Sequence, residues 1–533
     1  MEYSQITSKF TIALENENGD GKAMRKARKL LIAALTLALA LSLALPAAAA
    51  GNGAKSVKIT YRAIRVVVDG DCIVPIDATG TRVEPFILNG ATYMPLAATA
   101  NALGLKVTWD GPTKTVGLAD GGTVDKGSGT PPASRAVKNV AIYYSGVKIV
   151  KDGAPVELMD SNGGAVEPFI FNGTTYLPIG ILAKTLGTEV RWDGDTSTVY
   201  FGKMAQWLCT KQISRGADGA ITDTTECTYD ENGNVLTEKI SDSDGYSQTS
   251  TYTYDKYGNV LMEKTTANDG SGYTEKYTYD EHFNLAADET RNDDGSFSSK
   301  YYTYDADGNT LTEKYSGTDG SCTNTYAYDA GGNMLTDTYT DGTDPTQNFV
   351  ETFTYNKNGN MLTDSTKNAD KSWSISAYTY DAGGNMLSES FSDSSGLKKT
   401  TTYTYDKNGS VLTEKCVSSQ GKEYSYTETY TYDAKGNVTK YDDRYLDGSW
   451  QTNYTVYDAR GNVVSLSVNS SSGSYTVKYT YDVYDRLTSE TESGDSTYGS
   501  GSVSYIYDIN GNTAKIKSSD GSSTEYTYAK FFY

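Results

Sequence analysis

From about Thr222 to the end of the chain, polar and apolar residues alternate in short runs separated by polar turns. Tyr252-Thr253-Tyr254 is one such run, and a second begins at Val260. Alternation with a period of two is typical of a β-strand, because successive side chains point to opposite faces. Between the runs, Asp255–Asn259 has the composition of a tight turn, with Gly258 at the left-handed position. Each unit therefore predicts two antiparallel strands.

The unit recurs about every 25 residues, and a tyrosine marks the same place in each of twelve copies. The marking residues are Tyr229, Tyr254, Tyr279, Tyr304, Tyr328, Tyr355, Tyr380, Tyr405, Tyr432, Tyr457, Tyr481 and Tyr507. An isolated hairpin is only marginally stable, so the units must stack and bury rows of tyrosine and leucine. The sequence predicts about 24 strands in a long antiparallel β-hairpin array, either a solenoid or an open spiral.

A longer repeat precedes the array. Asn89-Gly90 recurs as Asn172-Gly173, and Trp109 recurs as Trp192, each 83 positions later. In each copy the Asn-Gly pair joins two short apolar runs, which is typical of a type I′ hairpin. A proline then begins a segment with helical spacing, and a second hairpin follows. Each copy predicts a small α+β domain, an antiparallel sheet packed on one helix, with its tryptophan in the core.

The two repeats predict a mainly β protein built from successive parts. These are an N-terminal extension and signal peptide at 1–50, a first domain at 55–118, a linker at 119–137, a second domain at 138–203, a linker at 204–221 and the array at 222–533. The signal peptide is predicted from a basic segment at Met24, the predicted start, an apolar run over Leu30–Leu45 and small residues up to Ala50. The run is shorter than the roughly 20 residues of a membrane span, and an uncleaved anchor is the alternative. We expect an exported, extracellular or surface-held protein.

The composition excludes several classes of site. A net charge of −20 argues against nucleic acid as a partner, because phosphate binding needs a basic surface. The single histidine, His282, excludes most histidine-based metal sites and catalytic triads, and it lies in a degenerate turn. Five cysteines are odd in number and widely spaced, so no disulfide framework is predicted, although a Cys209–Cys227 bridge stays open.

No catalytic, cofactor-binding or metal-binding residue is predicted. Asp305–Asn309 offers several oxygens to Ca²⁺, but it lacks the glutamate that ends an EF-hand loop, and turn chemistry alone explains its residues. Exposed tyrosine rows could stack on sugar rings, although most tyrosines are expected to hold strand to strand. No binding residue can be singled out.

The array resembles the Tyr-Asp (YD) repeats of rearrangement-hotspot proteins, bacterial wall-associated proteins and teneurins. The resemblance implies extracellular β-structure, which in large members forms a hollow shell around a toxic C-terminal domain. Most units here read Gly-Asn instead of Gly-Arg-Leu, which Asp485-Arg486-Leu487 approaches, and the chain ends within the array. Since twelve units are few for a closed shell, we expect an open array.

The two 83-residue copies resemble the copper-amine-oxidase N-terminal-like domain, or stalk domain. The resemblance rests on the Asn-Gly hairpin, on Tyr93-Met94-Pro95-Leu96 and on Val107-Thr108-Trp109-Asp110. It implies accessory domains without copper, because the oxidases hold copper elsewhere with three histidines. One histidine in this sequence excludes amine oxidase activity.

Together these observations predict a non-enzymatic structural or binding protein, secreted or on the surface of a Gram-positive-type bacterium. The stalk domains would associate with the envelope, and the YD array would be an exposed adhesive, carbohydrate-binding or partner-binding part. The alternative is a remnant or carrier component of a polymorphic toxin system of the rearrangement-hotspot type. Expected partners are the cell envelope or a glycan, or another surface protein or effector. No cofactor, no nucleic acid and no membrane span in the mature chain are expected.

Overall fold

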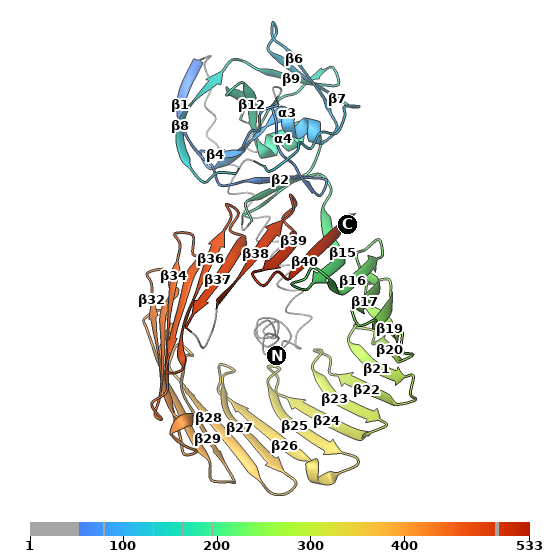
Figure 1. Cartoon of the computed structure of the whole chain (residues 1–533), viewed down its shortest axis with the longest axis vertical. Coiled ribbons are helices and arrows are strands. Elements are labelled where there is room, and N and C mark those ends of the chain that lie inside the picture. The colour runs from blue at the N-terminus through green and yellow to red at the C-terminus, as the bar shows by residue number, and fades with distance from the viewer. Residues whose placement is uncertain are drawn as a thin grey trace. The chain divides into compact units, whose positions relative to one another are not determined.

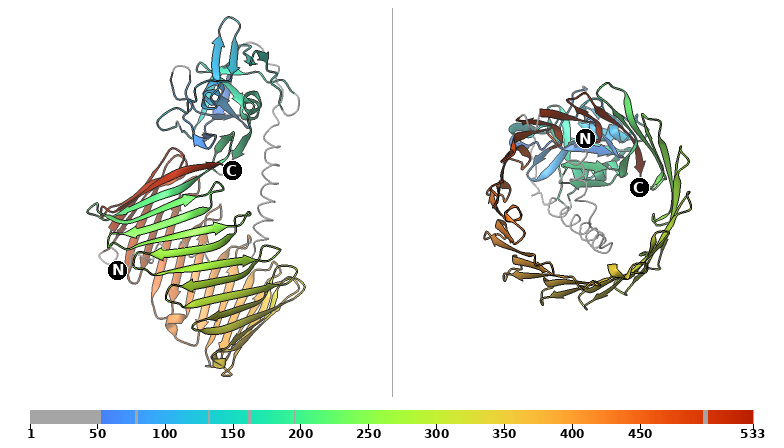
Figure 2. Two further views of the ribbon diagram at one scale, coloured as in Figure 1. Left: turned by 90° about the vertical axis from the view of Figure 1, so that its right-hand side faces the viewer. Right: turned by 60° about the horizontal axis from the view of Figure 1, so that its bottom comes forward.

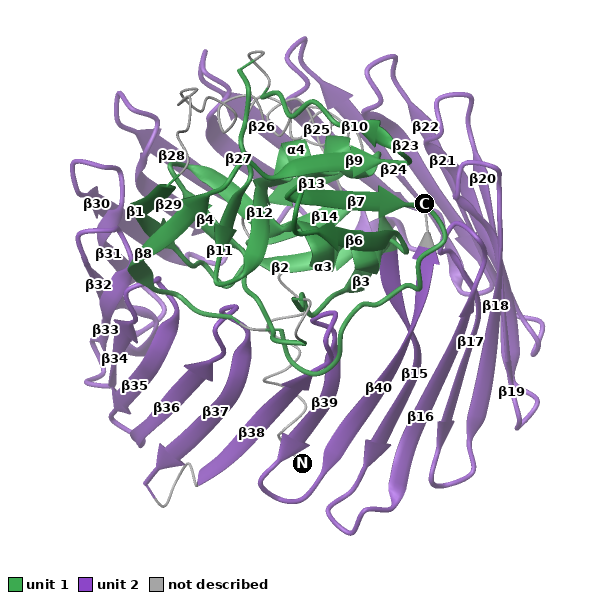
Figure 3. Ribbon diagram, turned by 90° about the horizontal axis from the view of Figure 1, so that it is seen from above, with its two compact units in different colours: residues 1–205 green, residues 206–533 purple. Residues whose placement is uncertain are grey.

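The computed structural model describes residues 53–532 apart from 78–79, 132, 161–163, 195 and 496–499 (Figure 1). The predicted signal peptide lies outside these residues. Within the described part, no helix is long and apolar enough to cross a membrane. The chain divides into two compact units, unit 1 at residues 1–205 and unit 2 at residues 206–533, which Figure 3 colours separately.

Unit 1 holds the two 83-residue copies, and each contains the predicted hairpin, helix and second hairpin. The first copy consists of β1 (Gly53–Thr60), β2 (Arg65–Val68), β3 (Asp71–Cys72), β4 (Phe86–Leu88), β5 (Ala91–Pro95), α3 (Leu96–Ala102), β6 (Lys106–Asp110) and β7 (Thr115–Ala119). The second consists of β8 (Val137–Tyr144), β9 (Lys148–Lys151), β10 (Ala154–Pro155), β11 (Phe169–Phe171), β12 (Thr174–Pro178), α4 (Ile179–Leu186), β13 (Val190–Asp193) and β14 (Thr198–Phe201). Asn89 and Gly90 both have positive φ, as a type I′ turn requires.

The two copies share their sheets. The closing hairpin of the first copy, β6–β7, joins β9 and β10 of the second in the order β10-β9-β7-β6. The closing hairpin of the second copy, β13–β14, joins β2 and β3 of the first in the order β13-β14-β2-β3. Strands from both copies also form the small closed barrel β1-β4-β5-β12-β11-β8. Each copy therefore completes its sheets with strands from the other.

The core of unit 1 follows from this exchange, because it draws buried side chains from both copies. Met94 and Leu96 of the first copy lie in one cluster with Leu177 of the second, and Trp192 packs against that cluster. Trp109, in contrast, is 53% exposed, so its predicted place in the core is wrong.

Unit 2 is a single antiparallel sheet of successive strands. They are β15 (Ala205–Arg215), β16 (Ile221–Tyr229), β17 (Val235–Asp242), β18 (Ser247–Tyr254), β19 (Val260–Ala267), β20 (Gly272–Tyr279), β21 (Leu285–Asn292), β22 (Phe297–Tyr304), β23 (Thr310–Gly317), β24 (Gly320–Tyr328), β25 (Met334–Asp341), β26 (Phe349–Tyr355), β27 (Met361–Asn368), β28 (Trp373–Tyr380), β29 (Met386–Asp393), β30 (Lys398–Tyr405), β31 (Val411–Ser418), β32 (Tyr426–Tyr432), β33 (Val438–Tyr445), β34 (Trp450–Tyr457), β35 (Val463–Ser470), β36 (Gly473–Tyr481), β37 (Leu487–Gly494), β38 (Ser500–Tyr507), β39 (Thr513–Ser518) and β40 (Ser523–Phe532). Short 3₁₀ turns, η1 (Pro345–Gln347) and η2 (Lys422–Tyr424), lengthen two of the hairpin loops.

The sheet closes on itself, so the predicted open array is wrong (Figure 2). The seam joins the first and last strands: the Thr210 hydroxyl donates to the carbonyl of Thr527 at 3.2 Å, and the hydroxyls of Ser214 and Thr524 are 3.3 Å apart. Closure pairs both edges of the sheet, which an open array would leave as unpaired backbone. The predicted linker at 204–221 carries β15, whose sequence lacks the Tyr-Asp signature and so escaped the repeat count.

The predicted turn chemistry is confirmed in atomic detail. In the turn after β22, Asp305 Oδ1 accepts from the backbone N–H groups of Asp307 and Asn309, and Oδ2 accepts from the Asn309 side-chain amide. At the strand end, the Tyr304 hydroxyl donates to the carbonyl of Leu285 in the preceding unit at 2.7 Å. The turn therefore closes one hairpin, and the tyrosine joins that hairpin to the preceding unit.

The exchange in unit 1 predicts that a single copy does not fold alone. Residues 53–118 lack β14, the partner of β2, and β9, the partner of β7. We expect this fragment to show poor amide dispersion by NMR and no cooperative unfolding, whereas residues 53–203 show both properties of a folded domain. A dispersed spectrum from 53–118 alone would contradict the shared core.

A second prediction concerns the loops that connect one unit to the next, such as the loop between β19 and β20 that contains Gly270. Gly270 has a φ of 85° and its missing Cβ would meet nothing within 4 Å, while Lys371 holds the same place with a φ of 73°. A left-handed backbone costs a non-glycine residue about 1 kcal/mol. Lys371→Gly should therefore raise the free energy of unfolding by about 1 kcal/mol, and Gly270→Lys should lower it by about the same amount. Urea denaturation of both variants tests the pair, and shifts of equal sign would contradict this account.

Candidate binding surface on the tyrosine face

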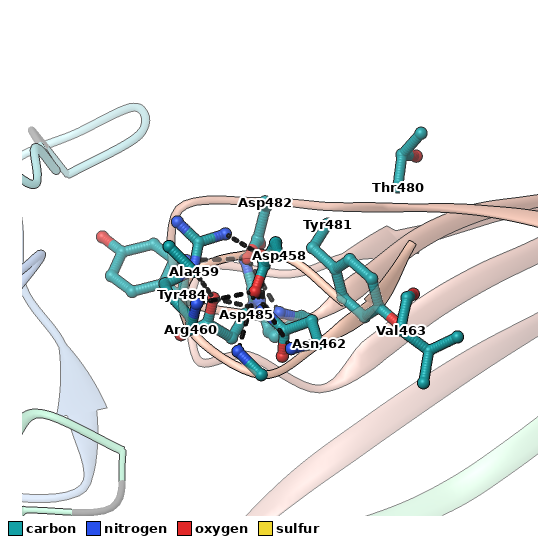
Figure 4. A network of polar contacts seen from close by, with 12 residues as sticks. Asp458, Ala459, Arg460, Asn462, Val463, Thr480, Tyr481, Asp482, Tyr484 and Asp485 are labelled. Atoms are coloured by element: carbon teal, nitrogen blue, oxygen red, sulfur yellow. Dashed lines mark hydrogen bonds and ion pairs between the residues drawn. The ribbon is translucent and has the colours of Figure 1, made fainter. Parts of the chain in front are cut away.

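Strand register sorts the side chains of the array onto two faces. Tyr302 and Tyr304 lie on one face of β22, and Thr303 lies on the other, as the alternation of a strand requires. Tyr302 lies directly opposite Glu313 of β23. We call the face that holds these residues the tyrosine face. Thr480 and Tyr481 show the same division at close range in Figure 4.

A carboxylate recurs at the place of Glu313 in most units, always opposite the residue two positions before the marking tyrosine. The register pairs are Cys227–Glu238, Tyr252–Glu263, Tyr277–Asp288, Tyr302–Glu313, Tyr326–Asp337, Phe353–Asp364, Tyr378–Glu389, Tyr403–Glu414 and Tyr479–Glu490. These carboxylates form an acidic row that runs along the tyrosine face. A sequence signal for it exists in the recurring Leu-Thr-Glu-Lys, in which glutamate and lysine must point to opposite faces.

From the exposure of its side chains we infer that the tyrosine face is the inner face of the closed sheet. Side chains converge on a concave surface and diverge on a convex one, so the concave face is the less exposed. Thr401, Cys416 and Val468 on the tyrosine face are 2%, 1% and 4% exposed. Val350 and Val456 on the opposite face are 41% and 54% exposed. On this basis the acidic row lies on the inner side of the closed sheet, whose outline is the ring in Figure 2.

Tyrosine hydroxyls donate to the acidic row. The hydroxyl of Tyr273 donates to Glu263 at 2.7 Å, and that of Tyr426 donates to Glu414 at 2.7 Å. Burial and the nearby Glu263 carboxylate raise the pKa of Tyr252 to about 12, so this phenol stays protonated and available as a donor at neutral pH. The tyrosine hydroxyls thus supply hydrogen bonds to some carboxylates of the acidic row, but they do not neutralise its negative charge.

Several carboxyls of this face have an unfavourable environment for their charge. Burial, with a smaller effect of Glu313, raises the pKa of Asp337. Burial and the neighbouring Glu428 likewise raise the pKa of Asp443. The pKa of Glu351 is raised by burial and by repulsion from Asp364. The inner face is therefore an acidic surface that holds its charge at a cost.

One pair of neighbouring turns is linked by charges (Figure 4). Asp485 occupies the position of the turn glycine with a φ of 66°, a conformation that costs a residue with a Cβ about 1–2 kcal/mol. Its carboxylate accepts from Arg460 Nε at 2.5 Å and from the Asn462 side-chain amide at 2.9 Å. These charge-assisted contacts offset the strain and join two successive units.

The other residues that the sequence singled out do not come together. His282 is exposed at a turn tip, where its backbone N–H donates to Asp280 Oδ1 at 2.8 Å. Both oxygens of Asp305 are engaged by its own turn, and the five cysteines are free. In the part of the chain that the structure describes, no three His, Cys, Asp or Glu side chains are grouped to hold a metal ion.

Unit 1 contains a cavity of about 450 Å³ that the sequence did not predict. It lies where residues after α3 and α4 meet the ends of β2 and β14, and the backbone N–H of Lys203 donates to Asp69 Oδ1 there at 2.8 Å. Because its lining comes from both copies, no single repeat carries its pattern. The lining residues are Asp69, Leu103, Leu105, Leu186, Gly187, Thr188, Glu189, Gly202 and Lys203.

The raised carboxyl pKa values predict how stability depends on pH. A carboxyl whose pKa is higher in the folded state binds a proton more readily there, so folding becomes more favourable as pH falls toward that pKa. Between pH 7 and about pH 5 we expect the unfolding temperature of the array to rise. At lower pH it should fall, because hydrogen bonds from Asn309 and its backbone lower the pKa of turn residues such as Asp305.

Asp443→Asn and Glu351→Gln, which remove two of these charges, should flatten the rise above pH 5. The turn variant Asp305→Asn should leave that rise in place and serves as the control. Scanning calorimetry of the three variants against pH measures the effect. A wild-type unfolding temperature that falls steadily from pH 7 would contradict the assignment.

Comparisons with known proteins bear mainly on unit 1. Residues 75–126 and 159–217 match the family model of the copper amine oxidase N-terminal domain. No curated protein sequence matches the chain. Among solved structures, the Photorhabdus luminescens Tc holotoxin pore is 14% identical over 73% of this chain and 22% of that chain, with a TM-score of 0.35. The TcdB2–TccC3 crystal structure is 13% identical over 88% of this chain and 26% of that chain, also with a TM-score of 0.35.

The chain thus spans about a quarter of those toxin chains, and TM-scores of this size support no argument about its fold or function. Each matched range includes the Asn-Gly hairpin, the helix and the closing hairpin of one copy, and this agrees with the stalk-domain resemblance. Two segments of this chain are therefore similar to the copper amine oxidase N-terminal domain.

Proposed function

We propose that this protein is a non-enzymatic, exported carrier whose closed array encloses a polypeptide partner. The observation that supports the proposal is the closure of the array with its tyrosine face inward. The YD resemblance raised the carrier role as an alternative, and the expected openness of the array was the argument against it. Because the sheet is closed, it can surround a partner.

Closure also weakens the adhesive interpretation of the array. The adhesive interpretation requires rows of exposed tyrosines on which sugar rings could stack. The marking tyrosines instead donate hydrogen bonds to backbone carbonyls of neighbouring units. Tyr405, for example, donates to the carbonyl of Met386 at 2.5 Å. An outside glycan would meet the convex face instead, where threonine, lysine and scattered aromatics such as Trp373 lie. Unit 1 is left for attachment to the envelope, the accessory role that the stalk-domain resemblance implies.

Site-specific cross-linking tests the carrier role. A photo-reactive amino acid in place of Tyr302 reports on the inner face, and one in place of the adjacent Thr303 reports on the outer face. We expect a polypeptide adduct from position 302 in the producing cells, protected from added protease, and little adduct from position 303. The adducts are identified by mass spectrometry.

Envelope glycan captured at position 303, with no polypeptide at 302, would favour the adhesive role and overturn the carrier role. Sedimentation of residues 53–203 and of the full chain with purified cell walls tests the attachment separately. A chain that sediments no better than an unrelated secreted protein would contradict envelope association.

A further inference from the structure

Four buried side-chain oxygens on the tyrosine face have no hydrogen-bond partner. They are Asn324 Oδ1, Asp337 Oδ1, Asp443 Oδ1 and Asn453 Oδ1. All four are acceptors, and strand register places each on the face that carries the acidic row. A buried acceptor without a donor is destabilising, because it has lost its hydrogen bonds to water and gained none in return. The inner face therefore lacks donors at defined places.

The orphan acceptors lie within two groups of carboxylates on neighbouring strands. Around Asp443, which is 8% exposed, Glu428 is the direct cross-strand neighbour, and Glu414 lies opposite Glu428 on the next strand. Tyr426 and Tyr430 donate to Glu414 and Glu428. The Asp443 carboxyl also has a phenol partner, Tyr445, but its Oδ1 atom has no hydrogen-bond partner.

The second group has the same arrangement. Asp337 lies directly opposite Glu351 of the next strand, and Asp364 follows opposite Phe353. Asn324, one strand earlier, gives its amide to the Tyr326 hydroxyl at 2.9 Å, which leaves its oxygen unsatisfied. The second group therefore brings together three carboxylates and one amide oxygen without a hydrogen-bond partner.

The array places much of its own positive charge on the opposite face. In each Glu-Lys pair, register turns lysine away from the glutamate, as for Lys264 beside Glu263 and Lys415 beside Glu414. Lys300 and Lys399 are exceptions that lie on the tyrosine face. The ion pairs found on the strands, such as Lys211–Glu226 and Arg444–Asp442, belong to the outer face.

We propose that the two groups around Asp443 and Asp337 bind lysine or arginine side chains of an enclosed polypeptide segment. This inference rests on the carrier function and names the chemistry of its partner. Guanidinium and ammonium groups are donors only, and guanidinium offers five N–H groups in a planar fork. They supply both the missing donors and the missing positive charge.

A polypeptide fits the spacing of the row better than a small cation does. Successive carboxylates of the row lie two strands apart, which is about 10 Å at the spacing of a β-sheet. An extended chain advances about 3.3 Å per residue, so a basic residue at every third position could meet successive carboxylates. Binding at several places along one chain also raises its effective local concentration, which free arginine or a short polyamine gains less.

The test is binding of labelled synthetic peptides to the full chain, refolded from urea with peptide present so that entry is not limiting. A peptide that repeats arginine–glycine–glycine is the probe, because it places a basic residue at every third position. A glutamate–glycine–glycine repeat of equal length is the charge control, and spermine is the small polycation. We expect retention of the arginine peptide after gel filtration, and no retention of the glutamate peptide.

Glu428→Gln with Asp443→Asn should weaken arginine-peptide binding at least about tenfold, the loss of one or more charge-assisted contacts. Glu226→Gln with Glu289→Gln removes the same charge from the outer face and should leave the affinity within about twofold. The thermal unfolding of each variant without peptide shows that it folds, and the isosteric change at Asp443 relieves a buried charge.

Equal loss in both double variants would show general electrostatic attraction and overturn the site. Binding of spermine but not peptide would also overturn it, because the site would then be a polyamine site. Failure of the arginine peptide to bind, together with a polypeptide adduct at position 302, would leave the carrier function intact with an uncharged partner. Failure of both experiments would remove the carrier function itself.

Discussion

The array depends on one hydrogen bond that recurs from unit to unit: the hydroxyl of a marking tyrosine donates to a backbone carbonyl of the preceding unit. Tyr254 bonds to Val235, Tyr279 to Val260 and Tyr481 to Val463, at 2.6 to 2.9 Å. Each such bond contributes only about 1 kcal/mol net. Its geometric effect is larger, because it sets how every hairpin sits on its neighbour.

That constraint determines which side chains share a face. Once the tyrosine is directed at the preceding unit, the residue two positions earlier and the carboxylate opposite it must lie on the same side. Lysine, one residue after glutamate, must lie on the other side. The acidic inner face and the more basic outer face are thus consequences of a single register repeated along the sheet, and a slip of one residue would exchange them.

In unit 1 the two copies depend on each other for a hydrophobic core. An 83-residue copy is too small to bury a large core, and the exchange of closing hairpins lets two copies build one. The cluster that joins Met94 to Leu177 exists only because both copies contribute to it. A cavity such as the one beside Asp69 and Lys203 likewise belongs to the pair, not to either repeat.

The sequence alone determined the hairpins, the turns and the two helices, because each depends on residues close together in the chain. Asp305 and Asn309, or Asn89 and Gly90, carry their conformation locally. The recurring Leu-Thr-Glu-Lys indicates that glutamate and lysine lie on opposite faces. Only the strand register shows that the glutamates of successive units share the tyrosine face. Tertiary structure alone decided that the array closes, that β15 joins it, that the copies exchange hairpins and that the tyrosine face lies inside. These outcomes depend on twist and on pairing between residues as far apart as Thr210 and Thr527, which no local pattern records.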